Sequence, residues 1–264
     1  MNADMTERLV RFQQPEKTLT YLGGLDETRV AALFGLDPDA YRGLRQGFDD
    51  RLRQIAAELL MDAGFADHVA RLPFAPGQHV VAIGESTTAD RLSWFEILRH
   101  ILPDDITLTN LAISGCTSTQ ALTQLPALPF HRPDWVLCML GGNDAQRLGP
   151  TGAPTLVSST ETERNLLTLR ELITQRTSAR WVWLTPASVD EERISTYPHF
   201  QRARITWTNK DIDSIAEFLR AQREPTLDTR AVTSGLHLDD GLHLTLAGQR
   251  AIAVALVHAL AELS

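Results

Sequence analysis

Short apolar runs alternate with amphipathic segments along most of this chain, a pattern typical of strands alternating with helices. Five runs have the length of buried strands, at 80–83, 107–113, 135–140, 181–184 and, more weakly, 230–233. Between and after them, apolar residues recur with the spacing of one helix face, at 94–101, 121–125, 161–175, 212–219 and 246–263. The alternation predicts an α/β fold of three layers, α/β/α, around a central parallel sheet of five strands.

The first 75 residues carry only helical patterns. The longest helix is expected to begin at Asp37-Pro38, because Asp is a favoured N-cap and Pro suits the first helical position. An apolar stripe follows over 41–59, and Gly64 is expected to end this helix. Shorter helices are expected at 28–34 and 66–72.

Helix-breaking residues and composition suggest where the chain divides. The segment up to about Lys17 is expected to be a disordered start, and Pro73 and Pro76-Gly77 separate the helices from the first strand. We therefore expect an N-terminal helical extension over residues 1–75 and the α/β domain over 76–264. The extension could cap a site, cover the edge of the sheet or form the interface of a homo-oligomer.

Charge and composition exclude several classes of protein. With 25 Lys and Arg against 33 Asp and Glu, the net charge is −8, so the chain lacks the positive surface that nucleic acids and anionic membranes require. No apolar run approaches the ~20 residues that span a bilayer. The start of the chain has no secretory signal pattern, and Cys116 and Cys138 are expected to be small buried residues rather than a disulfide framework. We expect a cytoplasmic protein that binds no nucleic acid and does not insert into membranes.

Polar residues follow each of the first three strands, at the edge where parallel sheets bind ligands. The segments are Gly84-Glu85-Ser86, Ser114-Gly115-Cys116 and Gly141-Gly142-Asn143-Asp144, and Asp240-Gly241-Leu242-His243 precedes the last helix. Taken singly, each is ordinary, because Gly and Asn are common in turns and an Asp near a His often forms a surface pair. Taken together, a hydroxyl, an imidazole, a carboxylate and small N–H donors are the groups that acyl transfer needs.

These segments resemble the four sequence blocks of the SGNH hydrolases, also called the GDSL-like esterase/lipase family. The similarity extends over roughly residues 79–264, and its most specific parts are Gly-x-Asn-Asp and Asp-x-x-His followed by Leu-Thr-x-x-Gly. One residue departs from the family pattern, because the usual Asp before the Ser is here Glu85, one methylene longer. The resemblance implies a flavodoxin-like α/β fold and a serine esterase without a cofactor.

The resemblance also implies a role for each site residue. Ser86 would be the nucleophile, His243 the general base and Asp240 the carboxylate that orients the imidazole. The oxyanion hole would consist of the backbone N–H groups of Ser86 and Gly115 and the side-chain amide of Asn143. Gly115 suits this role because the missing Cβ lets the substrate approach the backbone.

Several neighbouring residues are weaker candidates. The hydroxyls of Ser114 and Ser118 do not follow the first-block pattern, and His237 lacks the downstream Leu-Thr-x-x-Gly. Asp144 is expected to fix its loop rather than contact substrate. The Asp and His residues of 237–243 do not have the spacing of a typical metal site, so we expect no metal ion.

Three functions remain open for this chain. The first is hydrolysis of a small-molecule carboxylic ester through an acyl-serine intermediate, and the second is transfer of the same acyl group to an alcohol or sugar. The third is a non-catalytic binding protein on a hydrolase fold. In the loop after the fourth strand, Tyr197, Phe200 and Trp207 could form the wall of a substrate pocket or pack beneath the loop as core.

Overall fold

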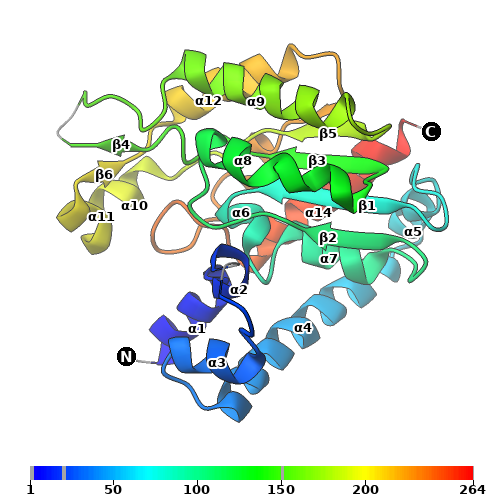
Figure 1. Cartoon of the computed structure of the whole chain (residues 1–264), viewed down its shortest axis with the longest axis horizontal. Coiled ribbons are helices and arrows are strands. Elements are labelled where there is room, and N and C mark those ends of the chain that lie inside the picture. Colours follow the sequence, from blue (N-terminus) through cyan, green and yellow to red (C-terminus); the bar gives the residue numbers. More distant parts are fainter. Residues whose placement is uncertain (1–2, 20–21, 150–151, 264) are drawn as a thin grey trace.

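A five-stranded parallel sheet forms the centre of the protein (Figure 1). The computed structural model describes residues 3–19, 22–149 and 152–263. Along the sheet the strands follow the order β2-β1-β3-β5-β7, and each neighbouring pair is parallel. Their bounds are β1 His79–Gly84, β2 Thr107–Asn110, β3 Trp135–Met139, β5 Arg180–Leu184 and β7 Thr226–Leu227. The predicted parallel sheet is confirmed.

Helices cover both faces of this sheet, as the three-layer prediction requires. Figure 1 shows α8, α9 and α12 on one face and α7 and α14 on the other. In the α/β part the helices are α6 Ser86–Ala89, α7 Trp94–Ile101, α8 Ser118–Gln124, the 3₁₀ helix η1 Leu125–His131, α9 Ser159–Thr174, α10 Glu191–Thr196, α11 Pro198–Ala203, α12 Asn209–Arg220, α13 Arg230–Thr233 and α14 Leu246–Ala261. The helices before the sheet are α1 Ala3–Phe12, α2 Pro15–Thr18, α3 Glu27–Leu33, α4 Pro38–Leu60 and α5 Ala63–Ala70.

The strands alternate between two hydrophobic cores. In β1, Val80 and Ala82 belong to the core shared with α7 and α14, whereas Val81 and Ile83 belong to the core beneath α8, α9 and α12. Successive side chains of a strand point to opposite faces, so a strand covered on both faces has apolar residues at every position. The apolar runs that predicted β1, β3 and β5 reflect this double burial, whereas the edge strand β2 is only partly buried.

The N-terminal helices lie along the α7 side of the sheet (Figure 1). The long helix α4 packs against α7, and α5 packs against α14. Side chains of α4 and α5, including Phe48, Leu52 and Phe65, join the same hydrophobic core as β1. The boundary between an extension over 1–75 and a domain over 76–264 stays a prediction. No helix among the described residues combines the length and apolar character needed to cross a bilayer.

The prediction of a fifth strand at 230–233 is wrong. Arg230–Thr233 form the short helix α13, in which the Thr233 hydroxyl donates to the Thr229 carbonyl at 2.8 Å. The edge strand is instead β7, Thr226–Leu227. Two residues at a half-buried sheet edge are too few to leave an alternating pattern, whereas Ala231 and Val232 supply a short apolar run that resembles a strand.

The prediction of a disordered start up to Lys17 is also wrong, because α1 and α2 occupy this segment. Val10 is fully buried, and the guanidinium of Arg11 makes a buried two-bond contact to Asp90 at 2.6 and 2.7 Å. Considered alone, a short polar segment gives little reason to expect order. Its order here comes from contacts with residues far away in the chain.

The predicted end of the long helix at Gly64 is wrong by about one helical turn. Helix α4 ends at Leu60, and Gly64 lies inside the next helix, α5. The carboxylate of Asp62 accepts a hydrogen bond from the Phe65 N–H at 3.0 Å, which is the N-cap interaction that starts a new helix. The cap at Asp62 therefore sets the boundary, not the glycine.

Candidate active site

One cavity of about 520 Å³ brings the four predicted segments together. Ser86 follows β1, Gly115 lies in the loop after β2, and Asn143 follows β3. The cavity is lined by all three and by Asp240 and His243 from the loop before α14. Residues more than 150 positions apart in sequence thus meet beyond the carboxyl ends of the parallel strands, where open α/β sheets bind ligands.

Ser86 is the first residue of α6, and Gly115 has the positive φ of +78° that glycine adopts without strain. Within the part of the chain that the structure describes, neither backbone N–H has a hydrogen-bond acceptor. Both residues line the cavity. Two backbone donors are therefore available to an anionic atom beside the Ser86 side chain.

Asp240 and His243 form a tight pair. The Nδ1 atom of His243 lies 2.7 Å from Oδ2 of Asp240, while Oδ1 accepts the backbone N–H groups of Leu242 and His243, both at 2.8 Å. Burial opposes the charge of Asp240, but the hydrogen bond and charge of His243 and these backbone donors lower the pKa of Asp240 to about 2. An ionised carboxylate thus faces Nδ1 of His243, and Nε2 has no hydrogen-bond partner among the described residues.

The hydroxyl of Ser86 makes no hydrogen bond to the imidazole of His243, although both described side chains line the cavity. The ring of Phe12, on helix α1, lies against that imidazole, with ring centroids 4.5 Å apart. Catalytic hydrogen bonds are often long or poorly aligned without substrate and tighten in the enzyme–substrate complex.

Gly241, between the carboxylate and the histidine, sits in a place where only glycine fits. Its φ is +73°, and a Cβ here would lie 2.5 Å from the carbonyl oxygen of Asp190 and 2.9 Å from the backbone nitrogen of Ile194. Neither backbone atom can move without disturbing α10. The loop that carries Asp240 and His243 is therefore held against α10 through this glycine.

Replacing Gly241 by alanine should lower the free energy of unfolding by about 2–5 kcal/mol, combining the left-handed strain with overpacking. Urea denaturation measures the effect. The matched control is Gly235→Ala, because Gly235 has a similar φ of +72° but no atom within 4 Å of the place that the new methyl group would take. Equal losses in the two variants would contradict the close contact at Gly241.

The longer side chain of Glu85 reaches the loop after β3. Its Oε1 accepts the backbone N–H of Gly142 at 3.1 Å, and its Oε2 accepts the backbone N–H and side-chain amide of Asn143 at 2.9 and 3.0 Å. Burial raises the pKa of Glu85 to about 8, although these three donors favour the ionised form. A Cβ on Gly142 would lie 2.4 Å from Oε1, so a glycine at position 142 makes room for the extra methylene.

The side-chain amide of Asn143 has a second contact, to the carbonyl of Cys116 at 3.2 Å. Its two amide hydrogens therefore point toward Glu85 and Cys116 in this structure. Asp144 lies beneath the same loop, fully buried, and accepts the Ser118 N–H at 2.7 Å and the Thr162 hydroxyl at 2.8 Å. Asp144 fixes the loop and is not among the residues that line the cavity.

The rival residues have other partners. The Ser114 hydroxyl donates to the Phe12 carbonyl, and the Ser118 hydroxyl is buried and accepts the amide of Asn165 at 3.1 Å. His237 is buried, with Nε2 2.7 Å from the Ser188 carbonyl, and does not line the cavity. Among the described residues, no group of three or more His, Cys, Asp and Glu side chains could hold a metal ion.

The three aromatic side chains of the loop after β5 lie at the cavity and also pack on one another, and a role in substrate binding stays a prediction. Tyr197, Phe200 and Trp207 all line the cavity. They also pack on one another, with ring centroids 5.0 Å apart for Tyr197 and Phe200 and 5.2 Å apart for Phe200 and Trp207. Trp207 donates its indole N–H to the Gly142 carbonyl at 2.9 Å, which ties this wall to the loop after β3.

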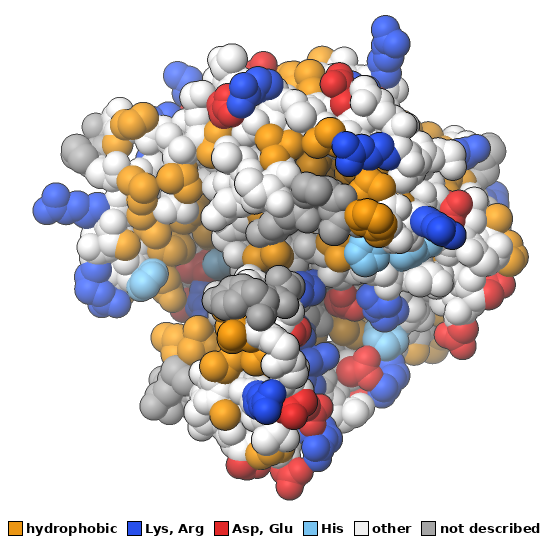
Figure 2. Space-filling view, viewed as in Figure 1, with side chains coloured by type: hydrophobic (Ala, Val, Ile, Leu, Met, Phe, Trp, Pro, Cys, Tyr) orange, Lys and Arg blue, Asp and Glu red, His pale blue; other side chains and the backbone are white. Residues whose placement is uncertain are grey.

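One wall of the cavity is formed by helix α1, which none of the sequence motifs indicates. Helix α1 contributes Met5, Arg8, Leu9 and Phe12, and the following Gln13 also lines the cavity. In the space-filling view, hydrophobic side chains of the N-terminal helices and of the α10–α11 region lie on either side of a hollow (Figure 2). The spacing of Met5, Leu9 and Phe12 is that of one helix face, and this signal could have indicated an ordered helix.

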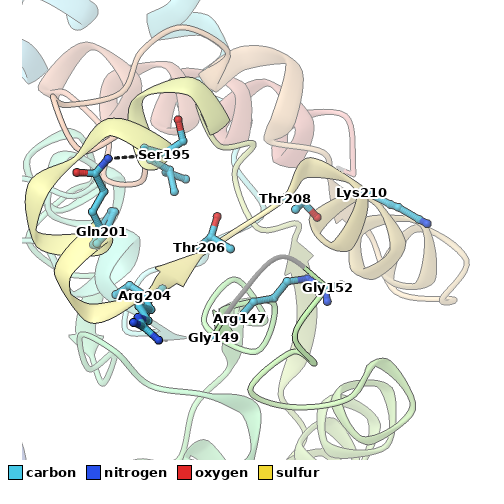
Figure 3. A pocket seen from close by; sticks show the side chains of 12 residues that line it. Arg147, Gly149, Gly152, Ser195, Gln201, Arg204, Thr206, Thr208 and Lys210 are labelled. Atoms are coloured by element: carbon cyan, nitrogen blue, oxygen red, sulfur yellow. Dashed lines mark hydrogen bonds between the residues drawn. The ribbon is translucent and has the colours of Figure 1, made fainter.

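A second cavity, of about 640 Å³, lies against α11 and β6 (Ile205–Thr206), which pairs with β4 (Arg147–Leu148) (Figure 3). Arg147 on its wall already pairs with Asp211 through two bonds of 2.8 Å. None of the residues of the four motif segments lines this cavity, and Phe200 lies on the wall of both cavities.

Comparisons with known proteins match the part of the chain that carries the four site segments. Residues 82–251 match the model of the GDSL-like Lipase/Acylhydrolase family. The chain is similar to the thioesterase 1/protease 1/lysophospholipase L1 of Escherichia coli K12, at 39% identity over 79 residues, which is 28% of this chain. That match spans only 38% of the length of the Escherichia coli protein.

Solved structures show a likeness in fold. A lipase/acylhydrolase from Enterococcus faecalis superimposes with a TM-score of 0.54 at 18% identity, covering 70% of this chain and 96% of its own. A carbohydrate acetylesterase family member from Sinorhizobium meliloti gives a TM-score of 0.54 at 18% identity, covering 68% of this chain and 95% of its own. With the family model matching most of the α/β part, the chain belongs to the GDSL-like lipase/acylhydrolase family.

Proposed function

We propose that this protein is a serine esterase that hydrolyses a carboxylic ester through an acyl-Ser86 intermediate. The observation that carries the proposal is the single cavity lined by Ser86 and by the hydrogen-bonded pair of Asp240 and His243. All three residues fall within the family-matched segment 82–251.

In this mechanism the imidazole of His243 takes the proton from the Ser86 hydroxyl as Oγ attacks the ester carbonyl. The ionised Asp240 holds the ring through Nδ1 and stabilises the imidazolium that forms. His243 then gives the proton to the leaving alcohol, and the acyl group stays on Ser86. Water, activated by the same imidazole, releases the acid and restores the serine.

The negative oxygen of the tetrahedral intermediate would be bound by three donors. The backbone N–H groups of Ser86 and Gly115 have no acceptor within the described structure, which supports their assignment. The third donor is the side-chain amide of Asn143, which would exchange its longer bond, to the Cys116 carbonyl, for the oxyanion. Glu85 keeps the amide in place during this exchange.

The cavity walls support a substrate with an apolar part. Leu9 and Phe12 of α1 line the same cavity as Tyr197 and Trp207, and about 520 Å³ is room for an acyl chain or an aromatic leaving group. The similarity to an Escherichia coli protein named as a thioesterase and lysophospholipase points in the same direction.

A series of p-nitrophenyl esters from acetyl to dodecanoyl tests the proposal. We expect turnover, with free acid released in a 1:1 ratio to nitrophenol and a maximum of kcat/KM at medium chain length. Adding an alcohol such as glycerol at low concentration should not divert the acyl group. Exclusive transfer to the alcohol would instead support an acyltransferase, and a folded protein inactive on the whole series would contradict the esterase.

A further inference from the structure

Helix α1 lies outside the family-matched segment but is hydrogen-bonded to residues within or next to three of the four site segments. Arg11 contacts Asp90 through two buried hydrogen bonds and donates to the Leu244 carbonyl at 3.0 Å. The Ser114 hydroxyl donates to the Phe12 carbonyl. The helix is therefore anchored beside the segments of Ser86, Gly115 and His243, independently of any contact that Arg8 makes.

Arg8 points from this helix to the carboxylate of Asp240. One terminal nitrogen of its guanidinium donates to Oδ1 of Asp239 at 2.7 Å, and the other donates to Oδ2 of Asp240. The same Oδ2 atom accepts Nδ1 of His243 at 2.7 Å. One carboxylate oxygen thus lies between the imidazole and a guanidinium whose side chain is only 25% exposed.

The two oxygens of Asp240 are held in different ways. Oδ1 is fixed by the backbone N–H groups of Leu242 and His243. Oδ2 has no backbone donor among the described residues, and its only partners there are the Arg8 guanidinium and the His243 ring. Because a carboxylate oxygen has two lone pairs, a guanidinium on one directs the other toward the imidazole.

We propose that Arg8 is a positioning residue for the Asp240–His243 pair, so that a helix outside the family-matched segment completes the active site. Arg8 acts through the carboxylate and need not contact substrate. It compensates the buried negative charge and holds Oδ2 in line with Nδ1, while Phe12 from the next turn of the same helix packs against the imidazole. The inference rests on the proposed esterase function of this pair.

The test compares Arg8→Gln and Arg8→Lys with a matched control on the same helix. Glu7 pairs with Arg51 of α4 at 2.8 Å, so Glu7→Gln removes an ion pair from α1 without touching Asp240. For Arg8→Gln we expect kcat to fall about tenfold to hundredfold, because the carboxylate of Asp240 loses its charged partner, with KM within about twofold. Arg8→Lys should recover part of kcat, and Glu7→Gln should retain full activity.

A spectroscopic readout separates positioning from general damage. The hydrogen-bonded Nδ1 proton of His243 should give a downfield proton resonance, assigned by its loss in His243→Ala. We expect Arg8→Gln to shift or broaden this resonance, and Glu7→Gln to leave it unchanged.

Arg8→Gln with both wild-type kcat and an unshifted resonance would overturn the proposal, as would an equal loss of kcat in Glu7→Gln. If the wild-type protein hydrolyses no ester, the esterase proposal fails, and the resonance alone then decides whether Arg8 holds the pair.

Discussion

Replacing Ser86 by alanine should reduce kcat for ester hydrolysis by about 10⁴- to 10⁶-fold, the largest effect expected for any single substitution in this protein. The reason is that the alanine variant cannot form the acyl intermediate, so only binding and the remaining oxyanion donors act on the substrate. The loss is measured as kcat on the best p-nitrophenyl ester, with an unchanged melting temperature showing that the fold is intact.

Ser114 provides the matched control for this substitution. It is a hydroxyl in the same cavity, but it donates to the Phe12 carbonyl and serves to hold helix α1. Ser114→Ala should therefore keep kcat within about tenfold of wild type, the effect of one lost neutral hydrogen bond. A Ser86→Ala variant that retains activity while Ser114→Ala loses it would move the nucleophile to residue 114.

Replacing His243 by alanine should reduce kcat by about 10⁴-fold or more, because a serine hydroxyl is a poor nucleophile without a base. His237→Ala serves as the comparison, since it removes a histidine six positions earlier that bonds the Ser188 carbonyl and lies outside the cavity. We expect this second variant to lower the melting temperature, because its ring is buried, and to keep most of kcat once folded. The reverse result, a silent His243→Ala and an inactive His237→Ala, would contradict the assignment of the base.

The elements predicted best from sequence are those whose local pattern and tertiary environment agree. Strands β1, β3 and β5 are covered on both faces, so their apolar runs are continuous and easily recognised, whereas the edge strand β2 is only partly buried. The last strand and the short helix α2 have no such pattern, and helix α1 is indicated only by the spacing of Met5, Leu9 and Phe12. β7 has only two residues, and helix α1 is fixed by contacts such as Arg11 with Asp90, 79 positions away, which no local pattern contains.

The residues of the site also divide into those that a local sequence motif indicates and those that only distant contacts place. Ser86, Asn143, Asp240 and His243 could be singled out because they sit in short motifs after strands or before a helix. The contribution of Arg8 could not, because a single arginine in a polar start carries no motif, and its meaning depends on the chain bringing it to Asp240. The departure at Glu85 was visible in sequence, but its accommodation by Gly142 is a packing relation that only coordinates provide.

The most direct test of the proposed mechanism is to treat the folded protein with a serine-reactive organophosphorus probe and map the adduct by mass spectrometry of its peptides. We predict one covalent adduct, on the Oγ atom of Ser86, formed much more slowly in His243→Ala. An adduct on a different residue, or none on a protein that hydrolyses esters, would contradict the mechanism.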